Sequence, residues 1–463
     1  MIWFSLKPFS GLLLILLPVF FFLVLTTAWA KPNKIVLAYS AHWLDEIYPP
    51  EAYNYQGMTH ITRSFLEVDA DGHLPVPEGY FNQALSEKAK KNGVKLLASI
   101  GGASAGEKNW LSMAKNPQYQ KRFFNELEKL IQDNHYDGVD IDWETMPQTD
   151  EDAKAFLSFM KALRARFPKW ILTTAVMAGD KWAKFLNWQD LSQSVDYIGL
   201  MTYDFSGDWS EYAYHHANLY SDPSSKAEEG ISADETVHRL ETKYGVKPGK
   251  LLLGVPFYGK NFLVANWNDP LPKEGKKLTG MRYSEALQAV KDGEYTEMWD
   301  EKAQAPYLKK KNGLGMVTYE TPRSLALKCK YVVDQKLSGI IIWVLGSDLV
   351  GNRTPLLDQV ALSFGSRARA IPPSAMAQME AAYLVEAKKE WDELSGLRDK
   401  LTKAGKKEEA LAAEPNRLPD LTPAKATEMK KLIRHLEELQ SFLNDATRKT
   451  RTAKRALGLD PNQ

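Results

Sequence analysis

The chain has 463 residues, of which 44% are hydrophobic and 25% are charged, so its composition is that of an ordinary globular protein with enough length for a large core. The formal net charge of +1 gives no electrostatic reason to expect a nucleic-acid partner. The single cysteine, Cys329, excludes an intrachain disulfide and a cysteine-rich metal site. The helical pattern around it predicts a small buried side chain.

The first 30 residues have the pattern of a secretory signal peptide. Lys7 precedes a long apolar run, and the small residues Ala28 and Ala30 form an A-x-A cleavage site. The alternative is an uncleaved membrane anchor, because the run approaches the length that spans a bilayer. Pro18 and the cleavage site favour the signal peptide. We therefore expect residues 1–30 to be removed on export, which gives a secreted or periplasmic protein.

Short apolar runs follow, separated by amphipathic helical patterns. Continuous runs of Val, Ile and Leu predict strands that are covered on both faces, and their alternation with helices predicts parallel βαβ units. The number of units and the length of the segment predict an α/β fold, the (β/α)8 TIM barrel. The runs begin at Lys34, Thr59, Val94, Asp137, Trp170, Val195, Lys250 and Leu337.

The seventh and eighth runs are separated by more chain than one crossover helix needs. The sequences "YSEALQAVKDG" and "GLGMVTYET" in this gap predict a small α+β insertion between strands 7 and 8. We expect the barrel domain, insertion included, to cover residues 31–365.

The composition changes at the end of the barrel domain. Residues 366–373 have the pattern of a linker, and beyond them Lys, Glu and Ala dominate without any strand signal. An apolar seam from Met429 to Ala446 follows a coiled-coil-like spacing. We expect residues 374–463 to form a C-terminal α-helical hairpin. It packs on the barrel, forms a charged solvated extension, or provides a surface for self-association or for a protein partner, and nothing in it carries catalytic chemistry.

The stretch "DGVDIDWE" places three carboxylates in the fourth predicted strand. Asp140, Asp142 and Glu144 share one face, because side chains two residues apart point the same way in a strand. Glu144 lies at the C-terminal end, where parallel barrels carry their catalytic residues. Charged groups this close favour a shared proton, which a general acid requires. The spacing favours acid catalysis and leaves a magnesium-type metal site and a buried structural network as alternatives.

The same stretch is similar to the D-x-x-D-x-D-x-E motif of glycoside hydrolase family 18, the chitinase family. "SIGG" resembles the family's third-strand motif, and its small residues Ser99, Gly101 and Gly102 would let that strand pack close to the carboxylates. "MTYDFSGDW" resembles the sixth-strand motif. "HHANLY", "GVPFYGKNF" and "IIIWVLGSD" are also similar to chitinase segments. The matches follow the family order across residues 34–350 and do not extend into the C-terminal helices.

The resemblance implies retaining hydrolysis of β-1,4-linked N-acetylglucosamine glycans, chitin or chito-oligosaccharides, in which the substrate's own acetamido oxygen attacks the anomeric carbon. Glu144 would protonate the leaving oxygen and later activate water. Asp142 would orient the acetamido group, Asp140 would hold the proton that Asp142 exchanges, and Tyr203 would hydrogen-bond the acetamido carbonyl. We expect no metal and no cofactor.

The resemblance also implies a set of substrate-binding residues. Trp343 would form the floor of the pocket for the reactive sugar and stack its apolar face on the pyranose. Met201 and Asp204 would line the same subsite. Tyr39 and Phe65 are further pocket residues.

Two positions depart from the common chitinase pattern. Thr145 follows the acid where many chitinases have Tyr, and Ala103 follows "SIGG" where many have an aromatic residue, with Trp110 as the nearest replacement. These changes affect the grip on substrate, so another N-acetylglucosamine glycan such as peptidoglycan stays open. A non-catalytic chitinase-like lectin is a further alternative, although such proteins typically lose the acid that Glu144 supplies here.

Overall fold

The predicted signal peptide and almost all of the predicted C-terminal hairpin lie outside the residues that the structure describes. Within the described residues, no helix combines the length and the apolar character needed to cross a membrane. The structure, a computed structural model, describes residues 33–103, 105–144, 147, 149–226, 231–273, 278–366, 371–376 and 378–379.

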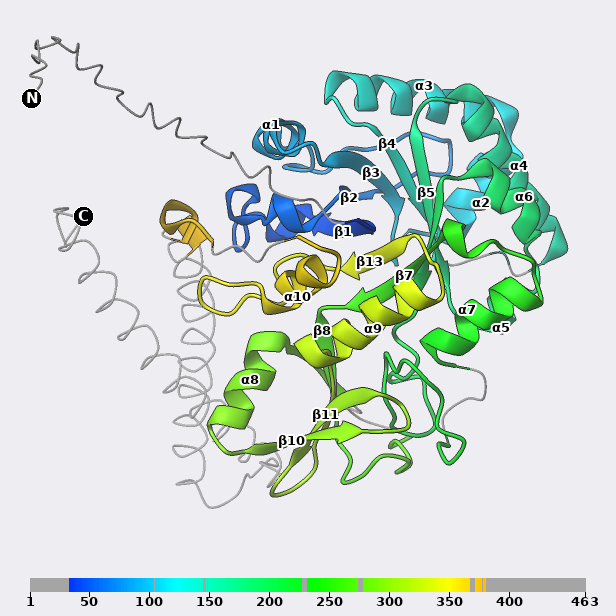
Figure 1. The fold of residues 1–463 in the computed structure, drawn as a ribbon. Coiled ribbons are helices and arrows are strands. Elements are labelled where there is room, and N and C mark those ends of the chain that lie inside the picture. Colours follow the sequence, from blue (N-terminus) through cyan, green and yellow to red (C-terminus); the bar gives the residue numbers. More distant parts are fainter. Residues whose placement is uncertain are drawn as a thin grey trace, which may run out of the picture.

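The predicted barrel is confirmed. Each of the predicted apolar runs forms a strand, and the strands close in the order β1-β13-β7-β6-β5-β4-β3-β2 (Figure 1). Neighbouring strands are parallel all the way round. The barrel strands are β1 (Ile35–Ala41), β2 (His60–Leu66), β3 (Lys95–Gly101), β4 (Gly138–Asp142), β5 (Ile171–Met177), β6 (Tyr197–Met201), β7 (Leu251–Pro256) and β13 (Gly339–Trp343).

Helices connect the strands and cover the outside of the barrel. Their starts follow from local sequence: the Asn116 side chain caps α3 ahead of Pro117, and the Thr149 side chain caps α4, whose first turn is acidic. The helices outside the insertion are α1 (Gln83–Lys91), α2 (Glu107–Lys115), α3 (Pro117–Asp133), α4 (Asp150–Arg166), α5 (Asp180–Ala183), α6 (Trp188–Ser194), α7 (Ala233–Thr242), α9 (Pro322–Asp334) and α10 (Pro355–Ser363).

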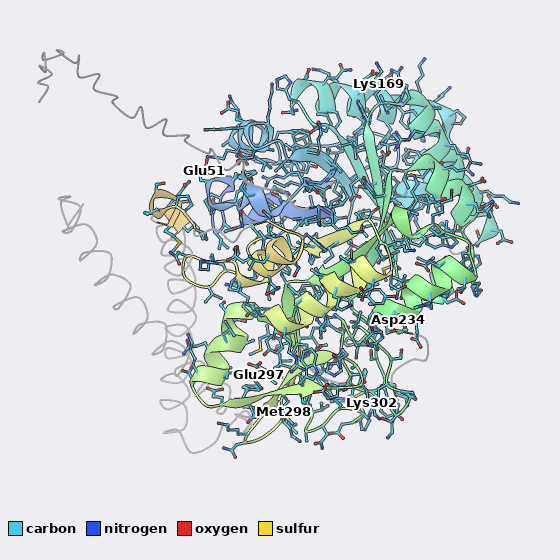
Figure 2. The ribbon with its side chains drawn as sticks, in the orientation of Figure 1. Glu51, Lys169, Asp234, Glu297, Met298 and Lys302 are labelled. Carbon is cyan, nitrogen blue, oxygen red and sulfur yellow. The ribbon has the colours of Figure 1, made fainter. Side chains whose placement is uncertain are left out.

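The predicted α+β insertion between the seventh and eighth barrel strands is also confirmed. It forms an antiparallel sheet of order β10-β11-β12-β8-β9, which Figure 1 shows below the barrel, away from α3 and α4. Glu297 and Met298 lie exposed on the edge strand β10 (Figure 2), where a charge opposes pairing with another chain. The elements are β8 (Tyr258–Phe262), β9 (Leu278–Arg282), α8 (Tyr283–Lys291), β10 (Tyr295–Asp300), β11 (Ala305–Lys310) and β12 (Met316–Thr318).

Two apolar clusters hold the barrel together. The larger one fills the layer between strands and helices and includes the buried Cys329, as predicted, together with Ile371 from within the predicted linker and Met379 from beyond it. A smaller cluster inside the barrel includes Leu37 and Ile341. Hydrophobic burial on both faces explains why most of the strand sequences are largely apolar, whereas β4 places Asp140 and Asp142 on its inner face.

The third and fourth strands approach each other closely because β3 ends in glycine. Gly101 has a φ of +128°, and a Cβ there would lie 1.9 Å from the backbone oxygen of Asp142. No side chain fits this contact, and the conformation itself is strained for L residues. Gly101 therefore determines how the carboxylate-bearing strand sits in the barrel, in agreement with the structural role expected for it.

We predict that Gly101→Ala lowers the free energy of unfolding by more than about 2 kcal/mol, because it adds backbone strain and a steric clash together. Gly280→Ala on β9 is the matched control, since a Cβ there meets nothing within 4 Å. Urea unfolding followed by circular dichroism measures both variants. Equal unfolding midpoints for the two variants would contradict the prediction.

Candidate active site

The three carboxylates of the fourth strand line up inside the barrel as predicted. Asp140 and Asp142 are almost fully buried, while Val139 and Ile141 face the helix layer. Glu144 follows the end of β4 and is half-buried at the mouth of the barrel. The row thus runs from the barrel interior to the surface, and only its outermost member reaches solvent.

Asp140 is held by hydroxyl groups from three different strands. The Tyr39 hydroxyl on β1 and the Ser99 hydroxyl on β3 donate to Oδ2 at 2.8 and 2.9 Å, and the Thr173 hydroxyl on β5 donates to Oδ1 at 2.5 Å. Burial raises the pKa of Asp140, and these three hydrogen bonds oppose the rise. Asp140 is therefore a fixed polar anchor, held through the register of β4 with β3 and β5 and by Tyr39 from β1.

Asp142 is the most perturbed member of the row. Burial raises its pKa well above the ordinary value, and the charges of Glu144 and Asp140 raise it further. Among the described residues, its buried Oδ1 has no hydrogen-bond partner. A buried oxygen without a partner is uncommon in proteins, and directly below Glu144 it is a candidate contact for a ligand.

Glu144 has a pKa of about 7, raised first by burial and then by the charge of Asp204. Near neutral pH, a large fraction of the molecules therefore carries a proton on this carboxyl group. An acid that is half-buried and titrates near neutrality has the properties of a proton donor and acceptor.

Asp204 follows β6 and stays ionised. Its Oδ1 contacts Lys260 Nζ at 2.7 Å, the Tyr258 hydroxyl at 2.6 Å and His216 Nδ1 at 3.3 Å. Burial alone would raise its pKa, but the contacts with His216 and Lys260 hold the pKa well below its usual range. A permanent negative charge therefore faces Glu144.

Tyr203 lies among these acids. Burial raises its pKa well above the ordinary value, and the charges of Asp142 and Glu144 add to the rise, so its hydroxyl keeps its proton and can donate. Met201, at the end of β6, is buried with 7% of its surface exposed. The sequence-predicted residues on β4 and on the segment 201–204 are thus brought together at one mouth.

Aromatic rings form the opposite wall. The Trp343 ring stacks on Phe65 with centroids 5.6 Å apart, and Tyr39 meets Trp343 edge-on at 5.2 Å. Trp43 continues the row, with its centroid 6.2 Å from that of Phe65. A cavity of about 770 Å³ lies along this wall, and Glu144, Trp43, Phe65 and Trp343 all line it.

The comparisons with known proteins agree with this geometry. The family model described as glycosyl hydrolases family 18 matches residues 35–348. The chain belongs to glycosyl hydrolase family 18. It is 27% identical over 383 residues to the endochitinase of Manduca sexta, covering 72% of this chain and 68% of that protein. It is also 27% identical over 368 residues to chitinase B of Serratia marcescens, covering 63% of this chain and 73% of that protein.

A solved structure gives the same result. The group IV chitinase of Ostrinia furnacalis in complex with allosamidin is 27% identical, with a TM-score of 0.65 over 72% of this chain and 100% of that one. The protein is accordingly a chitinase-like glycoside hydrolase of family 18.

One prediction about the family 18 groove is wrong. Trp110 was expected to replace the missing aromatic residue after "SIGG", but it is fully buried and stacks on Trp143 with centroids 5.3 Å apart. It lies on α2, whose apolar face packs inward, so its ring cannot reach a sugar. Ala103 itself lines the cavity and leaves this side of the groove open.

Several residues of the candidate site were not predicted from the sequence. Trp43 is 52% exposed and lies two residues after the end of the first barrel strand, which was the available signal. Lys260, Tyr258 and His216 lie in segments that resembled chitinase sequences, but no pattern linked them to Asp204. Among the described residues, no group of three or more His, Cys, Asp or Glu side chains has a metal-binding arrangement.

We predict that the Glu144 carboxyl titrates at about pH 7 and that Asp204→Asn lowers this midpoint, because the substitution removes the negative charge that disfavours ionised Glu144. Carbon-13 NMR of glutamate-labelled protein measures the midpoint, and Glu144→Gln assigns the signal. Asp222→Asn, which alters an ion pair with the exposed Lys302 (Figure 2), is the control. An unchanged or higher midpoint in Asp204→Asn would refute this origin of the shift.

Proposed function

We propose that this protein hydrolyses β-1,4-linked N-acetylglucosamine glycans with retention of configuration, by substrate-assisted catalysis. The observation that carries the proposal is Glu144, a proton carrier with a pKa of about 7 on the wall of an aromatic-lined cavity. The two buried carboxylates behind it supply the polar support that this chemistry needs.

The first step breaks the glycosidic bond. Glu144 gives its proton to the leaving oxygen while the acetamido oxygen of the same sugar attacks the anomeric carbon, so the substrate forms a cyclic oxazolinium-type intermediate and no protein nucleophile is needed. Asp142 accepts a hydrogen bond from the acetamido N–H and stabilises the positive charge that develops on the intermediate. Tyr203 donates its hydroxyl to the acetamido group and holds it in the attacking geometry. This role agrees with a hydroxyl that stays protonated.

Proton exchange within the row couples the protonation states of the three carboxyl groups. When Glu144 loses its proton, its new charge raises the proton affinity of Asp142, which is already raised by burial. Asp140 is the neighbour that exchanges this proton, and its three hydroxyl donors stabilise it when it is charged. The row therefore spreads one change of charge over three carboxyl groups.

The second step consumes water. Ionised Glu144 takes a proton from a water molecule, which attacks the anomeric carbon and opens the cyclic intermediate. The displaced acetamido group returns to its starting form, Glu144 is protonated again, and the product keeps the β configuration. No metal or cofactor enters this scheme.

The substrate is assigned from the groove and from the relatives. The row of Trp43, Phe65 and Trp343 offers apolar faces that suit the faces of successive pyranose rings. Proteins 27% identical to this chain are named endochitinase and chitinase B. We therefore propose chitin or chito-oligosaccharides as substrates, with Met201 and Asp204 lining the pocket of the reactive sugar and Trp343 forming its floor.

The remaining parts of the chain are assigned from sequence alone. We propose that residues 1–30 are a signal peptide cleaved after Ala30, that residues 31–365 are the catalytic domain, and that residues 374–463, after a linker over residues 366–373, form a helical hairpin that packs on the barrel, extends into solvent, or provides a surface for a protein partner or a second copy of the chain. The apolar run, the A-x-A site and the coiled-coil-like spacing support these assignments.

We predict that wild-type protein cleaves N-acetylglucosamine oligomers of four to six sugars and that Glu144→Gln lowers kcat by roughly 10²–10⁴-fold, because the amide cannot transfer the proton. Chromatography of the products by chain length measures both proteins and gives the cleavage mode. Glu297→Gln is the matched control, because this residue is exposed on β10 and lies away from the barrel (Figure 2).

Equal turnover by Glu144→Gln and wild type would contradict the assignment of Glu144 as the acid. Oligomer binding by wild type without any cleavage would favour a lectin or a differently decorated glycan such as peptidoglycan.

A further inference from the structure

A buried arginine links the segments that carry the outer part of the aromatic wall. Arg63 on β2 is fully buried, and its guanidinium uses all five N–H groups. Nε donates to the backbone oxygen of Tyr80 at 2.8 Å, and Nη1 and Nη2 donate to the Ser40 hydroxyl and the Gly79 backbone oxygen at 3.0 Å each. The two remaining bonds go to the two carboxylate oxygens of Asp45 at 2.7 Å each.

Asp45 belongs to the turn that presents Trp43. This turn is the short 3-10 helix His42–Leu44, in which no residue is buried and no side chain caps the start. Burial fixes it only in part, through Leu44, which packs partly buried against the smaller apolar cluster. It is tied to β2 by the bidentate pair between Asp45 and Arg63 and by His42 Nδ1, which lies 2.9 Å from the backbone oxygen of Ser64. Paired, charge-assisted bonds of this kind fix orientation as well as distance.

Arg63 also lies where β2 leaves its regular pairing. The register with β3 shifts between Arg63 and Leu66, so the ladder does not hold the intervening Phe65 in the ordinary way. Phe65 nevertheless stacks on Trp343 and lies beside Trp43. The guanidinium thus anchors the base of the strand segment carrying Phe65 and, through Asp45, the turn carrying Trp43.

We propose that Arg63 and Asp45 are positioning residues that align Trp43 with Phe65 and thereby set the affinity of the groove for longer glycans. Neither residue lines the cavity, so both act through the aromatic rings. The inference rests on the proposed function, because it takes the aromatic wall as the surface that binds successive sugar rings.

The test compares Asp45→Asn with Trp43→Ala, both in a Glu144→Gln background that prevents turnover. Titration calorimetry with N-acetylglucosamine oligomers of two and five sugars measures the gain in affinity with length. Asp45→Asn is expected to weaken binding of the five-sugar glycan about ten-fold, the size of one lost aromatic contact, and binding of the two-sugar glycan less than about two-fold. Trp43→Ala is expected to do the same.

The double variant separates positioning from a general loss of stability. If Asp45 acts through Trp43, Asp45→Asn adds no further loss of five-sugar binding to Trp43→Ala, because residues acting through one contact are not additive. Additive losses, or equal weakening for both glycan lengths, would overturn the proposal.

Two further variants guard against a folding defect. Asp196→Asn changes a carboxylate that likewise pairs with an arginine, Arg164 at 2.7 Å, beside the start of β6 at the opposite end of the barrel, and it should leave the length dependence unchanged. Asn82→Ser keeps a side chain able to cap α1 but removes the amide that donates to Asp45 at 2.9 Å. It should weaken five-sugar binding as Asp45→Asn does, by a smaller factor. If Asp45→Asn does not fold, unchanged five-sugar binding in Asn82→Ser would overturn the proposal.

Hydrolysis by the wild-type protein distinguishes this proposal from the proposed function. Cleavage by wild type together with an unaltered length dependence in Asp45→Asn rejects only the positioning role. If the wild-type protein neither cleaves nor binds the oligomers, the proposed function itself is rejected.

Discussion

The site depends on a row of carboxyl groups that a barrel strand carries from its interior to its mouth. The cost of burying one ionised carboxylate is several kcal/mol, so the row exists in folded protein only with its protons partly retained. Asp140 meets this constraint with hydroxyl donors from three strands, and Asp142 and Glu144 meet it with raised pKa values. Because these values exceed the unfolded ones, the row favours folding at acidic pH, and this contribution is lost as the pH rises through the folded values.

The two sides of the groove differ in their physical character. On the β6 side, Lys260, His216 and Tyr258 keep Asp204 ionised, and this fixed charge helps to hold the proton on Glu144. On the β1–β2 side, aromatic rings supply apolar area without charge. The charged groups and the aromatic rings of the groove thus come from separate segments of the chain.

The fold was predictable because the barrel strands are short runs rich in apolar residues and the crossovers between them are amphipathic. The carboxylate row was predictable for the same local reason, since a period of two along β4 suffices to place it on one face. The partners of Asp140 and Asp204 were not, because Thr173 reaches Asp140 through the register of β4 with β5, and Lys260 reaches Asp204 through the fold of the insertion. Trp110 was assigned wrongly because nearness in sequence to "SIGG" says nothing about which face of α2 is buried. Trp43 was missed because a lone aromatic in a turn has no periodicity.

The central claim is that Glu144 serves as the acid while the substrate supplies its own nucleophile. The most direct test is the anomeric configuration of the first products, followed by proton NMR within minutes of adding wild-type protein to a chito-oligosaccharide, before mutarotation. The account predicts that the new reducing ends form as the β anomer. Initial formation of the α anomer would mean that water attacks directly from the opposite face, and would contradict substrate assistance.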